Sequence, residues 1–223
     1  MKKVVILLVC VPLFIFAVSA NERLSSALTI LKELSNIPDS GAFVELLRQA
    51  EGIAIFPSLI KVGLVIGGQY GEGFMLKRNV DTGKWYGPVF LKLTGLSLGA
   101  QVGIQNVGLV LVLMNEQAVK NLVSGNITLG GSVSIAAGPM GRSLSAETDY
   151  KLQASMYSYS VSKGFFAGLS LQGSIVQVDN DANKEYYGSL LTSEEMLKRE
   201  PGTKEAIELV KFLNSLIYLQ PGE

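Results

Sequence analysis

Apolar residues alternate with glycine, glutamine and serine in two neighbouring stretches of the chain, residues 62–76 and 96–105. The sequence GGQYG at 67–71 returns as GAQVG at 99–103. Successive residues of a strand point to opposite faces, so each stretch separates apolar side chains from small or polar ones. The pattern therefore predicts two half-buried strands. A nucleotide-binding glycine loop would lead into a helix, and neither copy is followed by a helical pattern.

The turn signal Asp81-Thr82-Gly83 lies between these stretches and predicts that they form a hairpin. The small residues on one face of each strand have two explanations. Either another backbone segment approaches them closely, or they form a flat exposed surface for a ligand. The sequence alone leaves both explanations open.

Helical spacing of apolar residues precedes this region and predicts two short amphipathic helices, over residues 22–36 and 43–50. The segment GIAIFP that follows indicates a buried strand, which Pro57 is expected to stop. After the second glycine-rich strand, VGLVLVLM at 107–114 is an uninterrupted apolar run, as is typical of a strand buried on both faces.

The remaining pattern mixes short strands with helices. Asn115 is placed to cap a helix over 116–123, and alternation then predicts strands over 127–135, 144–156 and 167–178. The tail from Ser193 to Leu219 has helical spacing with a break at Pro201.

Together these elements predict an α+β fold. Its core is a twisted antiparallel β-sheet, or a β-barrel-like sheet, with N-terminal amphipathic helices and a C-terminal helix. An outer-membrane barrel would also show alternation and many glycines. The helices of soluble type at both ends of the chain and the continuous apolar run at 107–114 argue against it.

The first twenty residues, MKKVVILLVCVPLFIFAVSA, have two lysines, an apolar run and small residues at Val18-Ser19-Ala20. This pattern is typical of a signal peptide, cut after Ala20, so we expect a periplasmic or secreted protein. A retained membrane anchor is the alternative, because the apolar run is only slightly shorter than a membrane span.

Charge and reactive residues then narrow the function. Loss of Lys2 and Lys3 with the leader leaves 17 basic residues against 19 acidic ones, so no nucleic-acid partner is expected. The chain has no histidine, and its one cysteine, Cys10, lies in the leader. Disulfides, thiolate nucleophiles, Cys/His zinc sites and Ser-His-Asp triads are thereby excluded. We expect no cofactor and no enzyme, with a carboxylate enzyme using Glu147 and Asp149 as the weaker alternative.

One longer motif is specific. Residues 159–174, YSVSKGFFAGLSLQGS, resemble the signature Y-S-x-S-K-G-x-F-A-G-x-S-L-x-G-S of the SYLF domain family. Further pieces agree in order along residues 22–188, among them 52–57 and Trp85 with Pro88. The resemblance implies a SYLF domain over 21–190, with helices in 22–50 and a β-rich core in 52–188, and a helical tail over 191–223.

The resemblance implies binding without catalysis. Members bind membrane lipids, phosphoinositides in eukaryotes, through an amphipathic N-terminal helix with basic residues, and some fungal members bind actin. Actin is not expected as the native partner of an exported protein. The residues that match such a lipid site here are Arg23, Leu24, Leu28, Leu31 and Lys32, to which the fold could add Arg48, Lys61 and Lys163.

Two features weaken a phosphoinositide preference. Glu22 and Glu33 nearly neutralise the polar face of the helix, and Val161 stands where eukaryotic members often have arginine. The alternative function is a structural or protein-binding scaffold in the cell envelope, whose small-residue sheet face docks a partner. An exposed apolar stripe on residues 24–34 would favour lipid binding, and a buried stripe would favour the scaffold.

A weaker pattern has oxygen ligands at calcium-loop spacing, in Asp179, Asp181, Asn183 and Glu185. Lys184 occupies the position where that loop needs glycine. We therefore expect a solvated acidic turn at this place and no metal.

Overall fold

The computed structural model describes residues 18–37, 40–139, 154–162, 165–166 and 170–218. Its helices and strands, in chain order, are α1 (Ala20–Asn36), α2 (Gly41–Gln49), β1 (Gly52–Arg78), β2 (Trp85–Leu113), α3 (Glu116–Val123), β3 (Ile127–Thr128), β4 (Ile135–Ala137), β5 (Met156–Ser162), β6 (Phe165–Phe166), β7 (Ile175–Val178), α5 (Asn180–Tyr187), α6 (Ser193–Met196) and α7 (Lys204–Tyr218).

Two very long strands dominate the fold. The predicted strands at 62–76 and 96–105 are the middle parts of β1 and β2, which pair antiparallel from Gly52 with Leu113 to Arg78 with Trp85. The predicted hairpin turn before Trp85 is confirmed. Pro57 does not end the strand as expected, because a register shift between Phe56 and Leu59 absorbs it.

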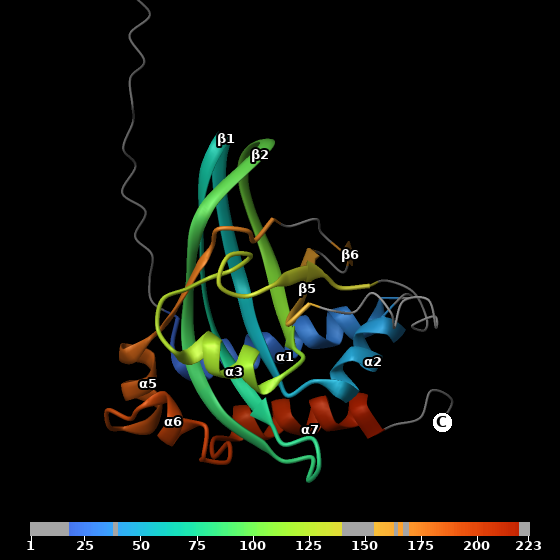
Figure 1. Cartoon of the computed structure of the whole chain (residues 1–223), viewed down its shortest axis with the longest axis vertical. Coiled ribbons are helices and arrows are strands. Elements are labelled where there is room, and N and C mark those ends of the chain that lie inside the picture. The colour runs from blue at the N-terminus through green and yellow to red at the C-terminus, as the bar shows by residue number, and fades with distance from the viewer. Residues whose placement is uncertain (1–17, 38–39, 140–153, 163–164, 167–169, 219–223) are drawn as a thin grey trace, which may run out of the picture.

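The β1–β2 ribbon forms an arch, because β1 bends back on itself halfway along its length (Figure 1). The two arms of β1 then meet at its glycines. A Cβ atom on Gly71 would lie 3.1 Å from the backbone oxygen of Ser58, and one on Gly73 would overlap the backbone of Ile55. The small face is therefore explained by close approach of a backbone segment, and at these glycines it is not an open ligand surface.

We call the top of this ribbon, residues 61–68 of β1 and 96–106 of β2, the arch apex. Among the described elements, only β1 and β2 reach the top of the molecule in Figure 1, and the helices α1, α2 and α7 lie at the other end.

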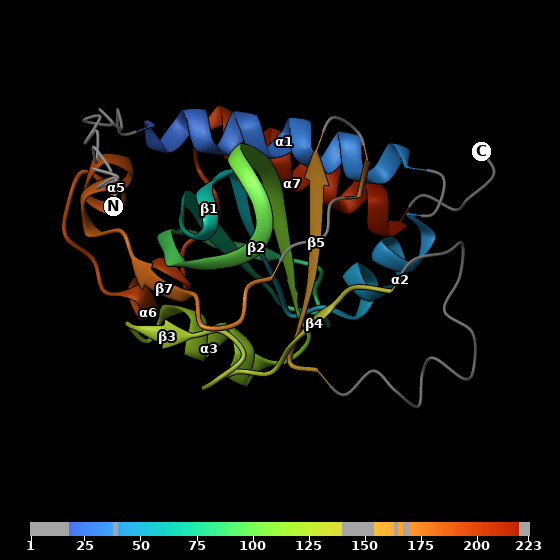
Figure 2. The ribbon, with the colours of Figure 1, turned by 90° about the horizontal axis from the view of Figure 1, so that it is seen from above.

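Both faces of the ribbon are covered below the apex. One hydrophobic cluster joins Val110 and Val112 of β2 to α1, α2 and α7, and α1 and α7 lie alongside each other in Figure 2. A second cluster joins Leu109 and Leu111 to α3 and to residues of β3, β7 and α6. This confirms that the run at 107–114 is buried on both faces. The two clusters contain residues from Ala20 to Ile217, so a chain that begins at Val18 keeps every residue of both.

The described strands form one seven-stranded sheet, and the α+β class with a curled sheet is confirmed. The sheet is not wholly antiparallel, because β4 pairs with β5 in parallel. The strand predicted over 167–178 is shorter than expected: a turn at Gly173, with φ of 81°, precedes β7. Of the strand predicted at 144–156, residues 144–153 lie outside the described residues.

The shorter helices follow their sequence signals. Asn115 caps α3 by accepting a hydrogen bond from the backbone of Ala118, as predicted. The tail contains α6 and α7 on either side of Pro201. No helix within the described ranges has the length and apolar character needed to cross a membrane.

Candidate functional site

The apolar stripe of α1 faces the protein interior. Leu24 and Leu31 are completely buried in the cluster with β1 and α7, and Leu28 packs against the same cluster. The stripe is therefore buried, which is the arrangement that favours a structural helix over lipid binding through these residues. The sequence alone could not decide this, because amphipathic spacing is the same whether a helix covers a sheet or lies in a membrane interface.

Arg23, expected to contact lipid head groups, is buried instead. Its guanidinium pairs with Glu72 of β1 and with Asp179, each at 2.9 Å, and it donates to the backbone oxygen of Val18 at 3.0 Å. The guanidinium also lies 5.9 Å from the ring centre of Phe90. These contacts hold the N-terminal end of α1 against the β1–β2 ribbon.

Asp179 is the centre of this buried network. It caps α5 by accepting from the backbone of Ala182, and it accepts from Arg23 and from Lys92 of β2. Burial alone would raise the pKa of Asp179, but the hydrogen bonds from Lys92 and Arg23 outweigh burial and hold this pKa below its ordinary value. The expected solvated acidic turn is wrong here, because Asp179 is buried and residues 180–187 are helical.

Tyr70 completes the network on β1. Its hydroxyl donates to Glu72 at 2.6 Å, and burial together with this bond raises the pKa of Tyr70 well above its ordinary value. Each charged group of the network is thus satisfied by another group of the same network. The arrangement stabilises the fold and offers no free acid, base or nucleophile.

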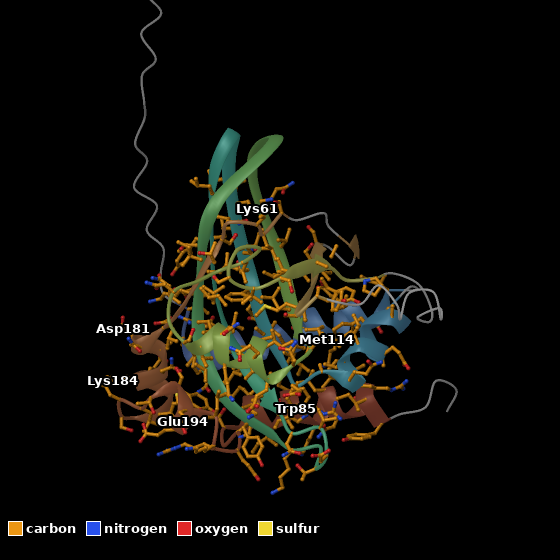
Figure 3. The ribbon with its side chains drawn as sticks, viewed as in Figure 1. Lys61, Trp85, Met114, Asp181, Lys184 and Glu194 are labelled. Carbon is orange, nitrogen blue, oxygen red and sulfur yellow. The ribbon has the colours of Figure 1, made fainter. Side chains whose placement is uncertain are left out.

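The other basic residues predicted for the lipid site lie apart from one another. Lys32 is exposed on α1, with its amino group 5.9 Å from the ring centre of Phe212. Arg48 of α2 donates to the backbone oxygen of Ile217 and pairs with Glu45. Lys61 lies on the upper part of the arch (Figure 3). Lys163 lies outside the described residues, as do Glu147 and Asp149. The structure therefore does not assemble the predicted set into one site.

The arch apex has a different composition from the rest of the surface. Val62, Leu96 and Ile104 are exposed there by 37%, 73% and 71% of their surface. Between Glu51 and Glu72 the only charged residue is Lys61, and residues 93–115 contain no charged residue. Figure 3 shows Lys61 near the apex and Glu194 at the opposite end of the molecule.

A groove with a volume of about 550 Å³ lies between α3 and α6. Lys77, Lys120 and Lys198 line it, and each pairs with Glu116 or Glu194 at 2.7–3.6 Å. The paired charges are solvent-exposed, so the groove has no strong preference for an anion. Nowhere in the described part of the chain do three or more His, Cys, Asp or Glu residues gather as a metal site would require.

Sequence reasoning missed the residues that matter here. Glu72 and Lys92 lay in no motif, and Asp179 was considered only as part of a calcium-like spacing, because the pairing of these residues depends on three distant segments meeting. The exposed apex did leave a signal, the long interval without acidic residues, but its exposure required knowledge of the bend in β1.

Comparisons with known proteins agree with the motif. Residues 94–216 match the model of the family described as "Ysc84: Las17-binding protein actin regulator". The SH3 domain-containing YSC84-like protein 1 of Rattus norvegicus is 33% identical over 85% of this chain and 57% of its own length.

Two further relatives give the same result. The protein of the same name from Xenopus laevis is 36% identical over 73% of the chain and 50% of its own length. LAS seventeen-binding protein 3 of Saccharomyces cerevisiae is 37% identical over 69% of the chain and 34% of its own length. The chain thus spans about half the length of the animal relatives and about a third of the yeast one. The match of the family model over more than half of the chain, and the breadth of these alignments, show that the chain belongs to the Ysc84, or SYLF domain, family.

Proposed function

We propose that this chain is a non-catalytic module that binds the surface of a phospholipid membrane. The observation that carries the proposal is the arch apex: Val62, Leu96 and Ile104 are exposed there, and the strand segments that carry them contain no acidic residue. An apolar surface next to a single lysine suits the boundary between head groups and acyl chains.

The family supports the coarser part of this proposal. Its relatives are named for SH3 domains and for binding to Las17, so their names are those of binding proteins. The chain matches only part of each relative, so we do not transfer Las17 or actin to it. The exposed residues of the arch apex instead support binding to a membrane surface of anionic or zwitterionic phospholipid.

Catalysis has little support among the described residues. The buried ionisable side chains Arg23, Glu72 and Asp179 satisfy one another and do not line the groove between α3 and α6. We therefore place the function in binding.

We also propose that residues 1–20 export the protein to the periplasm or the medium. The leader pattern is the basis for this proposal. Mass determination of the protein recovered from the periplasm of a producing bacterium tests it: a mass corresponding to residues 21–223 supports export with cleavage, and an uncleaved chain in the cytoplasm contradicts it.

The second candidate is a protein-binding scaffold in the cell envelope. The buried stripe of α1 favours it, since this was the outcome expected of purely structural helices. The docking face first suggested for it, the glycines of β1, is filled by the other arm of β1. Because that face is filled, a protein partner would have to bind elsewhere, and the groove between α3 and α6 is a candidate surface.

Co-sedimentation with vesicles tests the membrane proposal. The chain that begins at Val18 is mixed with vesicles of phosphatidylcholine, and with vesicles of phosphatidylcholine and phosphatidylglycerol, after its fold has been checked by circular dichroism. We expect it to sediment with vesicles, more strongly when they contain phosphatidylglycerol. If it stays in the supernatant with both compositions, the membrane proposal is wrong and the scaffold becomes the working hypothesis.

A further inference from the structure

We infer that the arch apex is the part of this protein that enters the membrane interface, with Val62, Leu96 and Ile104 in contact with lipid and Lys61 beside the phosphates. The inference rests on the proposed membrane function and names the surface that performs it. It replaces the stripe of α1, where sequence reasoning placed the contact.

Exposure is the first argument. Val62 and Ile104 are direct partners across the β1–β2 ribbon, so their side chains lie next to each other on one face. Leu96 is exposed where β2 pairs with Gly68. The apex is the projecting end of the described structure in Figure 1, so a flat surface can reach these side chains without meeting the helices first.

Charge is the second argument. Acidic side chains near a membrane surface are repelled by anionic lipids and are costly to dehydrate, and the strand segments that form the apex contain none. Lys61 makes no ion pair with any described residue, so its amino group is free to meet a phosphate. This combination is complementary to a phospholipid surface.

The backbone limits how deep the apex goes. Between residue 95 and residue 107, β2 pairs with β1 on one edge and with no other described strand on its second edge. Unpaired N–H and C=O groups are expensive in the hydrocarbon core, where no water can satisfy them. The apex therefore stays at the level of the head groups and the first part of the acyl chains, as interfacial elements do.

A membrane contact at the apex needs few side chains. Stable protein interfaces engage roughly 20–30 residues on each side. An interfacial membrane contact needs only a few exposed aliphatic side chains supported by charge, and Val62, Leu96 and Ile104 beside Lys61 supply them.

The alternative contact, α1, would require the fold to open. Exposing Leu24 and Leu31 to lipid removes them from the first cluster and separates Arg23 from Glu72 and Asp179. Leaving buried charges without partners is strongly unfavourable. Binding through the apex needs no such rearrangement.

A triple variant with a matched control tests the inference. The apex variant is Val62→Thr/Leu96→Thr/Ile104→Thr, in which threonine keeps the preference for strands. The control is Val80→Thr/Leu190→Thr/Ile207→Thr, which changes the same three residue types at sites exposed by 44%, 74% and 41% and lying outside the apex. We expect the apex variant to lose roughly tenfold or more in vesicle affinity, and the control to bind like the parent.

Lys61→Gln separates the two parts of the contact. On vesicles with phosphatidylglycerol we expect about a fivefold loss of affinity, and on pure phosphatidylcholine no loss, since one lysine contributes only to the electrostatic attraction. An equal loss on both compositions contradicts the assigned position of Lys61 beside the phosphates.

A fluorescent probe locates the contact directly. The chain that begins at Val18 has no cysteine, because Cys10 is the only one in the sequence. A nitrobenzoxadiazole dye is attached to Leu96→Cys, to Ser26→Cys on the exposed face of α1, and to Leu190→Cys. Only the dye at position 96 is expected to shift to the blue on vesicles and to be quenched by doxyl-labelled phosphatidylcholine.

The outcomes separate the inference from the function on which it rests. If the parent chain binds vesicles but the apex variant binds equally well, or the dye at position 26 shifts instead, the inference is wrong and membrane binding stands. If the parent chain does not bind vesicles at all, both are wrong.

Discussion

Arg23 donates to the carboxylates of Glu72 and Asp179 while its side chain is almost completely shielded from water. Removing one partner of a buried ion pair leaves the other charges unsatisfied, which is far more costly than the loss of an exposed pair. At the scale of single residues, this network is where substitutions will have their largest electrostatic effect on stability.

We therefore expect Arg23→Met to lower the free energy of unfolding by about 3–5 kcal/mol. Urea unfolding followed by circular dichroism gives the value. Lys32→Met, on the same helix but exposed, is the matched control and should change stability by less than about 1 kcal/mol. A similar, small effect of both substitutions would mean that the network contributes little.

The lowered pKa of Asp179 gives a pH dependence with a definite sign. Its carboxylate stabilises the folded state above the unfolded-state pKa of about 3.9, and this stabilisation is lost as the pH falls through the lower folded-state pKa. Asp179→Asn should therefore be much less stable than the parent at pH 7, and the difference should shrink towards pH 3. Thermal unfolding at both pH values measures it, and a difference that grows on acidification would contradict this assignment.

Gly73 is a test of the close approach within β1. A methyl group at this position meets the backbone of Ile55 and Phe56, so we expect Gly73→Ala to cost about 1–3 kcal/mol of stability. Gly68→Ala is the control on the same strand, because its added Cβ would have no neighbour closer than 4.0 Å. If the two variants are equally stable, the arms of β1 do not pack as described.

At the scale of elements, α1 shows what its sequence pattern does and does not determine. The apolar spacing correctly predicts a helix with one apolar stripe, but the pattern contains no information about what covers the stripe. The same holds for Arg23: a charge on an amphipathic helix looks alike in sequence whether it meets water, lipid or a buried carboxylate.

Binding through the apex predicts that α1 stays docked. Amide hydrogen exchange of residues 20–36, followed by mass spectrometry, should be the same with and without vesicles, whereas peptides from the apex should become protected. Faster exchange in α1 on vesicles would show that the helix leaves the body, and the proposed rigid binding would be wrong.

At the scale of the whole molecule, the sequence predicts the class of fold and most helices and strands, because alternation, helical spacing and caps are local signals. The hairpin from Asp81 to Gly83 and the capped helix after Asn115 were predictable in this way. The bend of β1, the parallel pairing of β4 with β5 and the meeting of Arg23 with Asp179 depend on distant segments, so no local pattern contained them.

Only one of the two properties of the arch apex could be predicted from the sequence, for the same reason. The interval without acidic residues is a property of the sequence, and it could have been noticed in advance. That Val62, Leu96 and Ile104 are exposed follows only from the arch, which lifts them away from both hydrophobic clusters.

The β1–β2 ribbon also has a consequence for how the protein folds. It is the shared wall of both clusters, and its outermost pair joins Gly52 to Leu113, residues far apart in the sequence. Neither cluster can become complete until the pairing has extended from the turn along the whole ribbon, so the two halves of the core are acquired together. Such non-local pairing makes folding slow. A fragment that contains only β1 or only β2 cannot form either hydrophobic cluster, because both clusters contain residues of the two strands.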